Sequence, residues 1–211
     1  MQQIIERRIV PVVVIDKVED AVPLAEALLA GGLDVLEVTF RTAAAEAAVR
    51  AIAQKMPVIL IGAGTILSPE QMDRAIGAGA KFGVAPGLNR RVVERARERK
   101  VPFVPGVMTP SEVELGLELG CTLQKFFPAA AAGGVAMLKA FAGPYGHTGV
   151  KFVPLGGISA ANAPDYFALP IVGAIGGTWI AERKLIAERK WAEITRNAKE
   201  IREIAARPAK G

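Results

Sequence analysis

The sequence predicts an α/β protein of the (β/α)8 class, a TIM barrel with a short N-terminal helix, built as one domain over residues 1–211. Eight short runs rich in Val, Ile, Leu and Phe recur along the chain. Longer stretches with apolar residues at helical spacing separate them. Continuously apolar strands that alternate with helices are typical of a parallel sheet covered by helices. An open doubly wound sheet is disfavoured, because no dinucleotide-binding glycine motif follows the first run.

The predicted elements start with a short helix over residues 2–8, which we expect to cap one end of the barrel. The eight predicted strands are RIVPVVVI (8–15), LDVLEVTF (33–40), MPVILIGAG (56–64), AKFGVAPG (80–87), VPFVPG (101–106), TLQKFFP (122–128), VKFVPLGG (150–157) and PIVGAIGG (170–177).

Two helices carry clear start signals. Ser68 is followed by Pro69, and Thr109 is followed by Pro110, with Gln71 and Glu112 three residues after the respective hydroxyl residue. This spacing predicts an N-cap, a proline at the first helical position and a capping box in both places.

Composition disfavours several classes of function. The net charge is +5, but 26 basic residues are scattered among 21 acidic ones without a basic block, so nucleic acid is not an expected partner. Gly, Pro or a charged residue interrupts every apolar stretch before it reaches membrane-spanning length. The N-terminus lacks the apolar core of a signal peptide, and Cys121 is the only cysteine. These features predict a cytoplasmic protein that does not bind membranes.

Lys125 stands near the end of the sixth predicted strand, where a barrel carries its chemistry. By the period of two it shares a face with Leu123 and Phe127. Full burial can lower the pKa of a lysine by about 3 to 5 pH units, which favours the neutral amine that attacks carbonyls to form a Schiff base. The alternative is that the strand faces the other way and Lys125 extends between the outer helices.

The second predicted strand offers polar partners. Glu37, Thr39 and Arg41 share one face of VLEVTFRT. Glu37 is a candidate to move protons, and Arg41 is a candidate to hold a carboxylate with its planar guanidinium group. The alternative is structural: an inert ion pair between Glu37 and Lys125, with Arg41 bound to Glu46 at the surface.

Glycine pairs close the last two predicted strands, in VPLGGIS and AIGGTW. The loops after these strands are the usual phosphate site of the barrel, where backbone N–H groups hold the anion. The two pairs together therefore predict a phosphate-binding end.

The fragments EVTFRT, GAGT, APG, PGVMTPSE, KFFPA, PLGGIS and IGGTW follow in an order and spacing that resemble the class I pyruvate aldolases. This family cleaves 2-keto-3-deoxy-6-phosphogluconate (KDPG) and 4-hydroxy-2-oxoglutarate (KHG), and the resemblance covers essentially the whole chain. It implies a (β/α)8 homotrimer that acts on small 2-keto acids and needs no metal or other cofactor.

The resemblance also implies roles for individual residues. Lys125 matches the Schiff-base lysine, and Glu37 matches the acid/base, which acts through water. Arg41 and Thr65 match the residues that bind the pyruvate carboxylate. Pocket walls and phosphate loops are matched by Pro86, Phe127, Gly156, Gly157, Gly176, Gly177 and Thr178.

Three positions depart from the family pattern. Leu155 stands where threonine is usual, so a hydroxyl that would meet the substrate is missing and discrimination should weaken there. Ala130 stands where an acidic residue is common, and Thr178 replaces a serine while keeping the hydroxyl. None of these changes removes a chemical role.

We therefore expect a Schiff-base aldolase that releases pyruvate and an aldehyde, with a metal-dependent aldolase disfavoured because no His, Cys, Asp and Glu cluster has metal-ligand spacing. Two alternatives stay open. One is a phosphate-binding barrel isomerase or epimerase, in which Lys125 is only an ion-pair partner. The other is a catalytically idle barrel that serves as an oligomeric scaffold.

Overall fold

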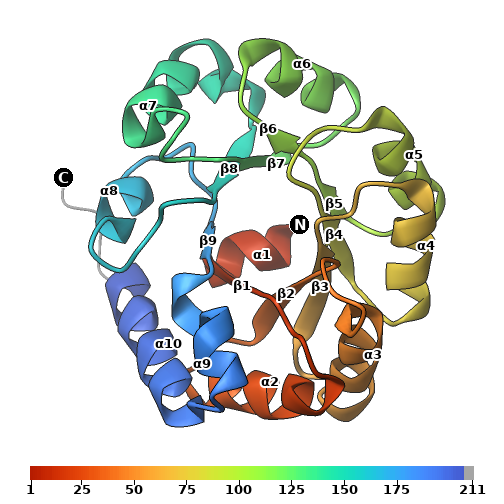
Figure 1. Ribbon diagram of the computed structural model, residues 1–211. Helices are drawn as coiled ribbons and strands as arrows, with labels where there is room; N and C mark the ends of the chain where they lie inside the picture. The colour runs from red at the N-terminus through yellow and green to blue at the C-terminus, as the bar shows by residue number, and fades with distance from the viewer. Residues whose placement is uncertain (207–211) are drawn as a thin grey trace.

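The computed structural model describes residues 1–206 and contains parallel strands surrounded by a ring of helices (Figure 1). The strands are β1 (Ile9–Val13), β2 (Val35–Thr39), β3 (Leu60–Gly64), β4 (Phe82–Val84), β5 (Phe103–Val104), β6 (Gly106–Val107), β7 (Leu123–Phe126), β8 (Lys151–Pro154) and β9 (Ile175–Gly177). The α-helices are α1 (Gln2–Arg7), α2 (Ala21–Ala30), α3 (Ala45–Lys55), α4 (Pro69–Gly77), α5 (Arg90–Glu98), α6 (Pro110–Glu118), α7 (Gly134–Tyr145), α8 (Ala163–Phe167), α9 (Arg183–Ala187) and α10 (Trp191–Ala206). Three short 3-10 helices are η1 (Val18–Asp20), η2 (Gly146–Thr148) and η3 (Trp179–Ala181).

All strand pairs are parallel, which confirms the predicted α/β class. Their ladders form two sheets, a six-stranded one in the order β5-β4-β3-β2-β1-β9 and a three-stranded one in the order β6-β7-β8. The prediction of one strand over residues 101–106 is wrong in this detail. Pro105 has no N–H to donate, so the ladder breaks between β5 and β6.

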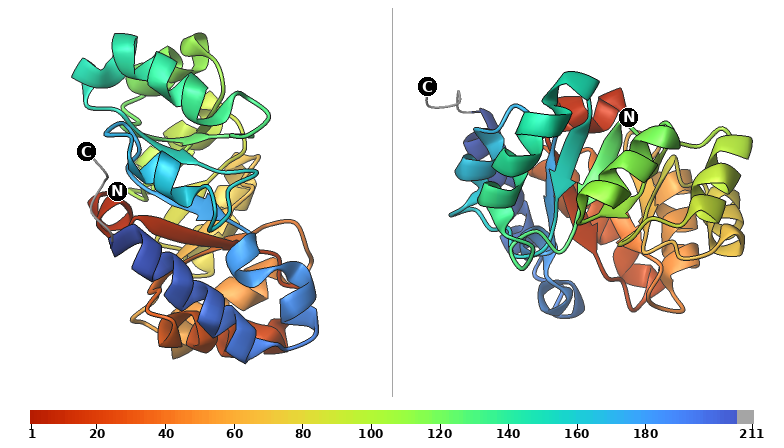
Figure 2. Two further views of the ribbon diagram at one scale, coloured as in Figure 1. Left: turned by 90° about the vertical axis from the view of Figure 1, so that its left-hand side faces the viewer. Right: turned by 90° about the horizontal axis from the view of Figure 1, so that it is seen from above.

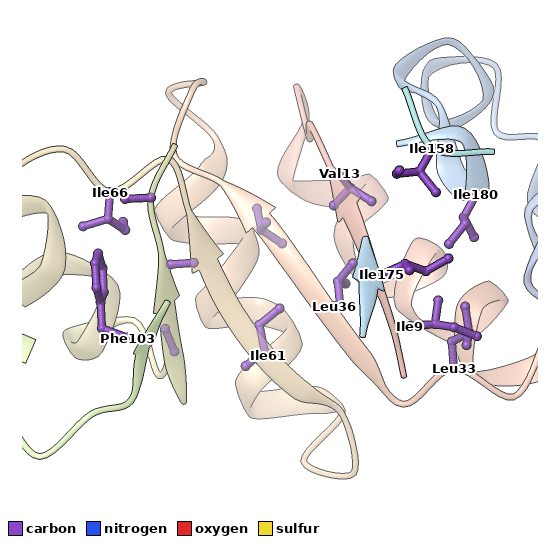
Figure 3. Close-up of a cluster of buried hydrophobic side chains, with 14 of the residues drawn as sticks. Ile9, Val13, Leu33, Leu36, Ile61, Ile66, Phe103, Ile158, Ile175 and Ile180 are labelled. Carbon is purple, nitrogen blue, oxygen red and sulfur yellow. The ribbon is translucent and has the colours of Figure 1, made fainter. Parts of the chain in front are cut away.

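Side chains alternate between two layers along the strands, as the period of two requires. One set, which includes Leu36 and Ile61, packs between the strands and the helices (Figure 3). The opposite set, which includes Val10, Val12 and Val35, forms an inner cluster enclosed by the strands. Polar residues on the inner faces are therefore surrounded by apolar side chains.

The predicted N-terminal helix is confirmed as α1. Its Ile4 is buried in the inner cluster, and its Arg7 donates two hydrogen bonds to Asp34, at 2.8 and 2.7 Å. Figure 2 shows α1 and α9 at opposite ends of the strands. Because the strands are parallel, α1 closes the end where they begin and the other end carries the loops after each strand.

The capping predictions hold at one helix and fail in part at the other. Thr109 and Glu112 form the full capping box of α6. At α4, the Ser68 hydroxyl accepts from the Gln71 N–H at 3.3 Å, but the Gln71 side chain accepts from the Leu67 N–H instead of the Ser68 N–H. Only half of that capping box is therefore present, and the Gln71 side chain instead holds the loop before α4 through Leu67.

No helix within residues 1–206 is long and apolar enough to cross a bilayer.

Candidate active site

A cavity of about 250 Å³ is lined mainly by residues at or just after the ends of strands, so it lies at the end away from α1. Ten of its lining residues are predicted site residues: Arg41, Thr65, Pro86, Lys125, Phe127, Leu155, Gly156, Gly157, Gly177 and Thr178. The other three are Val12, Thr39 and Ile158. Thr39 lies on the predicted polar face, but its hydroxyl donates to the Val13 carbonyl at 3.0 Å. Val12 and Ile158 carry no sequence signal beyond being apolar.

Lys125 lies on β7 with its side chain on the inner face, only 6% exposed. Its neighbour Gln124 points the other way, toward α6, where its amide donates to the Val113 carbonyl at 3.1 Å. The alternative in which Lys125 extends between the outer helices is therefore wrong. The Lys125 Nζ lies 5.2 Å from the centre of the Phe127 ring.

Glu37 lies on β2, 2% exposed, with its Oε1 3.7 Å from the Lys125 Nζ. That distance is too long for a hydrogen bond, and this oxygen has no hydrogen-bond partner among the described residues. Burial raises the pKa of Glu37, and the nearby Lys125 charge opposes this only in part. Gly64 makes room for the carboxyl, because a Cβ there would lie 2.0 Å from Oε1.

The raised pKa of Glu37 predicts a pH-dependent stability. Between the ordinary glutamate pKa of 4.5 and the raised pKa of Glu37 in the folded state, the folded protein binds more protons than the unfolded one. Stability therefore falls as pH rises through this window. We expect the free energy of unfolding of the wild type, relative to Glu37→Gln, to increase as pH is lowered from the alkaline side toward 4.5. Urea denaturation of both proteins across this range checks it, and a difference that does not change with pH contradicts it.

Arg41 and Thr65 lie at the rim of the cavity. Arg41 follows β2, is exposed, and makes no ion pair with the described residues. Glu46 binds Arg50 at 3.2 Å and Arg74 at 2.8 Å, so the predicted alternative of an Arg41–Glu46 salt bridge is wrong. Thr65 directly follows β3 with a φ of 57°, a left-handed conformation that is uncommon for threonine. Both side chains are free of competing structural roles.

Leu155 forms a buried wall between this cavity and a smaller apolar chamber below it. Glu37 and Lys125 also line that chamber. Leu155 covers Gly176, since a Cβ on Gly176 would lie 2.9 Å from the Leu155 Cγ. Gly176 therefore does not line the cavity, whereas Gly177 does. Because Gly176 has no side chain, Leu155 can pack directly against its backbone.

Gly156 and Gly157 form the cavity wall after β8. Both have left-handed backbones, with φ of 95° and 78°, which favour glycine. A Cβ on Gly157 would also lie 2.4 Å from the Ala130 Cβ, so the loops after β7 and β8 touch here. Across the cavity mouth, Thr178 is exposed at the start of η3.

The family model of the KDPG and KHG aldolases matches residues 1–197. The chain belongs to this aldolase family. This chain is 47% identical over 197 residues to a KHG/KDPG aldolase of Escherichia coli, and the match covers 93% of this chain and 92% of the relative. It is 44% identical to a 2-dehydro-3-deoxy-phosphogluconate aldolase of Haemophilus influenzae, covering 96% and 97%.

A KDPG aldolase from Legionella pneumophila has a similar structure, with a TM-score of 0.90 at 43% identity over 94% of this chain and 96% of that one. Its crystal structure contains pyruvate captured as a covalent carbinolamine intermediate.

The site of the aldolase brings an amine and a carboxyl group together in an apolar setting. An uncharged lysine amine is a nucleophile for a carbonyl carbon, and a buried carboxyl group with a raised pKa can both accept and donate a proton. Within residues 1–206, no group of three or more His, Cys, Asp or Glu side chains is arranged to hold a metal ion.

Proposed function

We propose that this aldolase cleaves KDPG to pyruvate and glyceraldehyde 3-phosphate through a Schiff base, and KHG to pyruvate and glyoxylate by the same route. The observation that carries the proposal is the buried Lys125 amine, which lines both the cavity at the ends of the strands and the chamber below it, where it lies 3.7 Å from the Glu37 carboxyl group. Family membership, over residues 1–197, supports it.

In the first step, the neutral Lys125 amine attacks the C2 ketone of the substrate and gives a carbinolamine. The carbinolamine hydroxyl then takes up a proton from solvent and leaves as water, which gives a protonated imine that can accept an electron pair. Arg41 and Thr65, at the rim, hold the substrate carboxylate and so direct C2 toward the amine.

In the second step, the C4 hydroxyl gives up its proton as the C3–C4 bond breaks. The bond electrons flow into the imine and form an enamine, while C4 leaves as an aldehyde. Glu37, acting through a water molecule, takes this proton and returns one to C3. Water then hydrolyses the imine, releasing pyruvate and the free lysine.

The walls of the cavity fix the substrate between these groups. Pro86 and Phe127 pack against its carbon chain, and Leu155 stands where its polar carbons pass. The phosphate is held by the loop residues Gly156, Gly157, Gly177 and Thr178. Gly176 has no side chain and so leaves room for Leu155.

We further propose that the two sheets form one closed eight-stranded barrel and a single domain. Two observations support closure. The Lys125 N–H donates to the Pro105 carbonyl at 2.8 Å, next to the break between β5 and β6, and Phe152 forms a parallel bridge with Val172 close to β9. On the basis of the family resemblance, we also propose a cytoplasmic homotrimer.

The proposed substrates predict a clear order of rates. Because a phosphate subsite adds binding energy that KHG does not use, we expect kcat/KM for KDPG to exceed that for KHG by about 100-fold or more. Coupling pyruvate release to lactate dehydrogenase measures both. Cleavage of neither substrate would refute the proposed function, and equal rates would refute its phosphate part.

A further inference from the structure

In the loop after β8, three successive backbone carbonyl groups are directed away from the cavity by hydrogen bonds. The carbonyl groups of Leu155, Gly156 and Gly157 all have hydrogen-bond donors outside the cavity. The Ala129 N–H donates to the first at 2.7 Å, and the Ala130 N–H donates to the second at 2.9 Å. The third accepts from the side-chain amide of Asn162, also at 2.9 Å.

This pattern fixes the direction of three N–H groups. In a planar trans peptide unit, the N–H points opposite to the C=O. The N–H groups of Gly156, Gly157 and Ile158 belong to the same three units, and none has an acceptor among the described residues. All three residues line the cavity. Their N–H groups are thus available to an anion there.

Asn162 contributes a second bond to this loop. Its side-chain oxygen accepts from the Ser159 N–H at 2.9 Å, so one amide joins the two sides of the turn. An asparagine directly before a helix normally caps that helix by accepting from its first N–H groups. Asn162 precedes α8 but makes no such bond, and both ends of its amide are used on the loop.

We infer that Asn162 is a positioning residue for the phosphate of the substrate. It holds the Gly157 carbonyl away from the cavity and thereby turns the Ile158 N–H toward the phosphate oxygens, beside the Gly156 and Gly157 N–H groups, whose peptide units are held by Ala129 and Ala130. The inference rests on the proposed function, whose catalytic groups on β2 and β7 lie on other elements and do not contact Asn162.

Asn162→Ala removes both bonds and leaves the catalytic groups in place. We expect KM for KDPG to rise about 10-fold, which is about 1.4 kcal/mol, with kcat within about 2-fold of the wild type. For KHG, which lacks the phosphate, KM stays within about 2-fold. An equal rise in KM for both substrates, or no rise for either, would overturn the inference.

Asn162→Asp keeps the size and the acceptor for Ser159 but cannot donate to the Gly157 carbonyl, and its carboxylate adds a negative charge beside the proposed phosphate site. We expect the same selective loss. Asn89→Ala is the matched control, since Asn89 also accepts from one backbone N–H, at 3.0 Å, and donates to one carbonyl, at 3.4 Å, but lies at α5 and outside the cavity. It should leave both KM values unchanged.

Binding of inorganic phosphate, measured by isothermal titration calorimetry, separates this inference from the proposed reaction. We expect phosphate to bind the wild type and Asn89→Ala equally, and Asn162→Ala about 10-fold more weakly. No phosphate binding to the wild type, or equal binding to Asn162→Ala, would overturn the inference even if KDPG is cleaved. Loss of cleavage with this binding order intact would refute only the proposed reaction.

Discussion

Lys125→Met abolishes KDPG cleavage, lowering kcat/KM by about 10⁴-fold or more, if the amine forms the Schiff base. Methionine cannot attack a carbonyl, so the covalent route is closed and about 5.5 kcal/mol of transition-state stabilisation is lost. The lactate dehydrogenase assay measures the loss. An isomerase or epimerase that relies on Glu37 would keep measurable turnover after this change.

The structure predicts that Lys125→Met remains folded. Methionine is apolar and similar in length, and the side chain it replaces is surrounded by the inner cluster. Glu37 is left without its neighbouring cation, but burial raises its pKa and favours the neutral form. Lys151→Met is the matched control, because Lys151 begins the neighbouring strand β8 at the opposite end, and within residues 1–206 its side chain bonds only to the Pro170 carbonyl, at 2.7 Å. Full activity in Lys151→Met and a folded, inactive Lys125→Met are the expected pair.

Glu37→Gln lowers kcat for KDPG cleavage by about 10² to 10⁴-fold, the usual contribution of a positioned acid/base group. Glutamine fills the same space over Gly64 and still contacts the amine, but it cannot exchange a proton. Formation of the Schiff base with pyruvate should survive, because Lys125 is retained. Exchange of pyruvate C3 protons with deuterated water, followed by NMR, should slow by the same factor as cleavage.

Glu46→Gln controls for the loss of a carboxylate, since Glu46 lies on α3, the helix that follows β2, and binds Arg50 and Arg74. It should cleave KDPG at the wild-type rate. If Glu37→Gln also keeps that rate, the proton is carried by another group and the role proposed for Glu37 is wrong.

The face of a strand on which a side chain lies was predictable from sequence, because side chains alternate between the two faces with a fixed period. That period placed Lys125 and Glu37 on inner faces, and parallel strands brought their ends to one side of the molecule. The break at Pro105 was also readable in principle, because proline cannot donate to a ladder. It was missed since the flanking residues are apolar and favour one continuous strand.

Contacts between loops were not predictable in the same way. Leu155 covers Gly176, about 20 residues further along the chain, and Ala130 packs on Gly157. These contacts depend on how neighbouring strands align, which local pattern does not fix. Asn162 was missed for a related reason. Asparagine before a helix indicates a cap, and only the folded loop reveals that its amide is used elsewhere.

The central claim is that the Lys125 amine is the covalent nucleophile, and borohydride trapping tests it most directly. The wild type is incubated with pyruvate, reduced with sodium borohydride, digested and mapped by mass spectrometry. We predict one reduced pyruvate adduct, on the peptide that contains Lys125, and none in Lys125→Met. The absence of an adduct on that peptide, or an adduct on another lysine, would contradict the account.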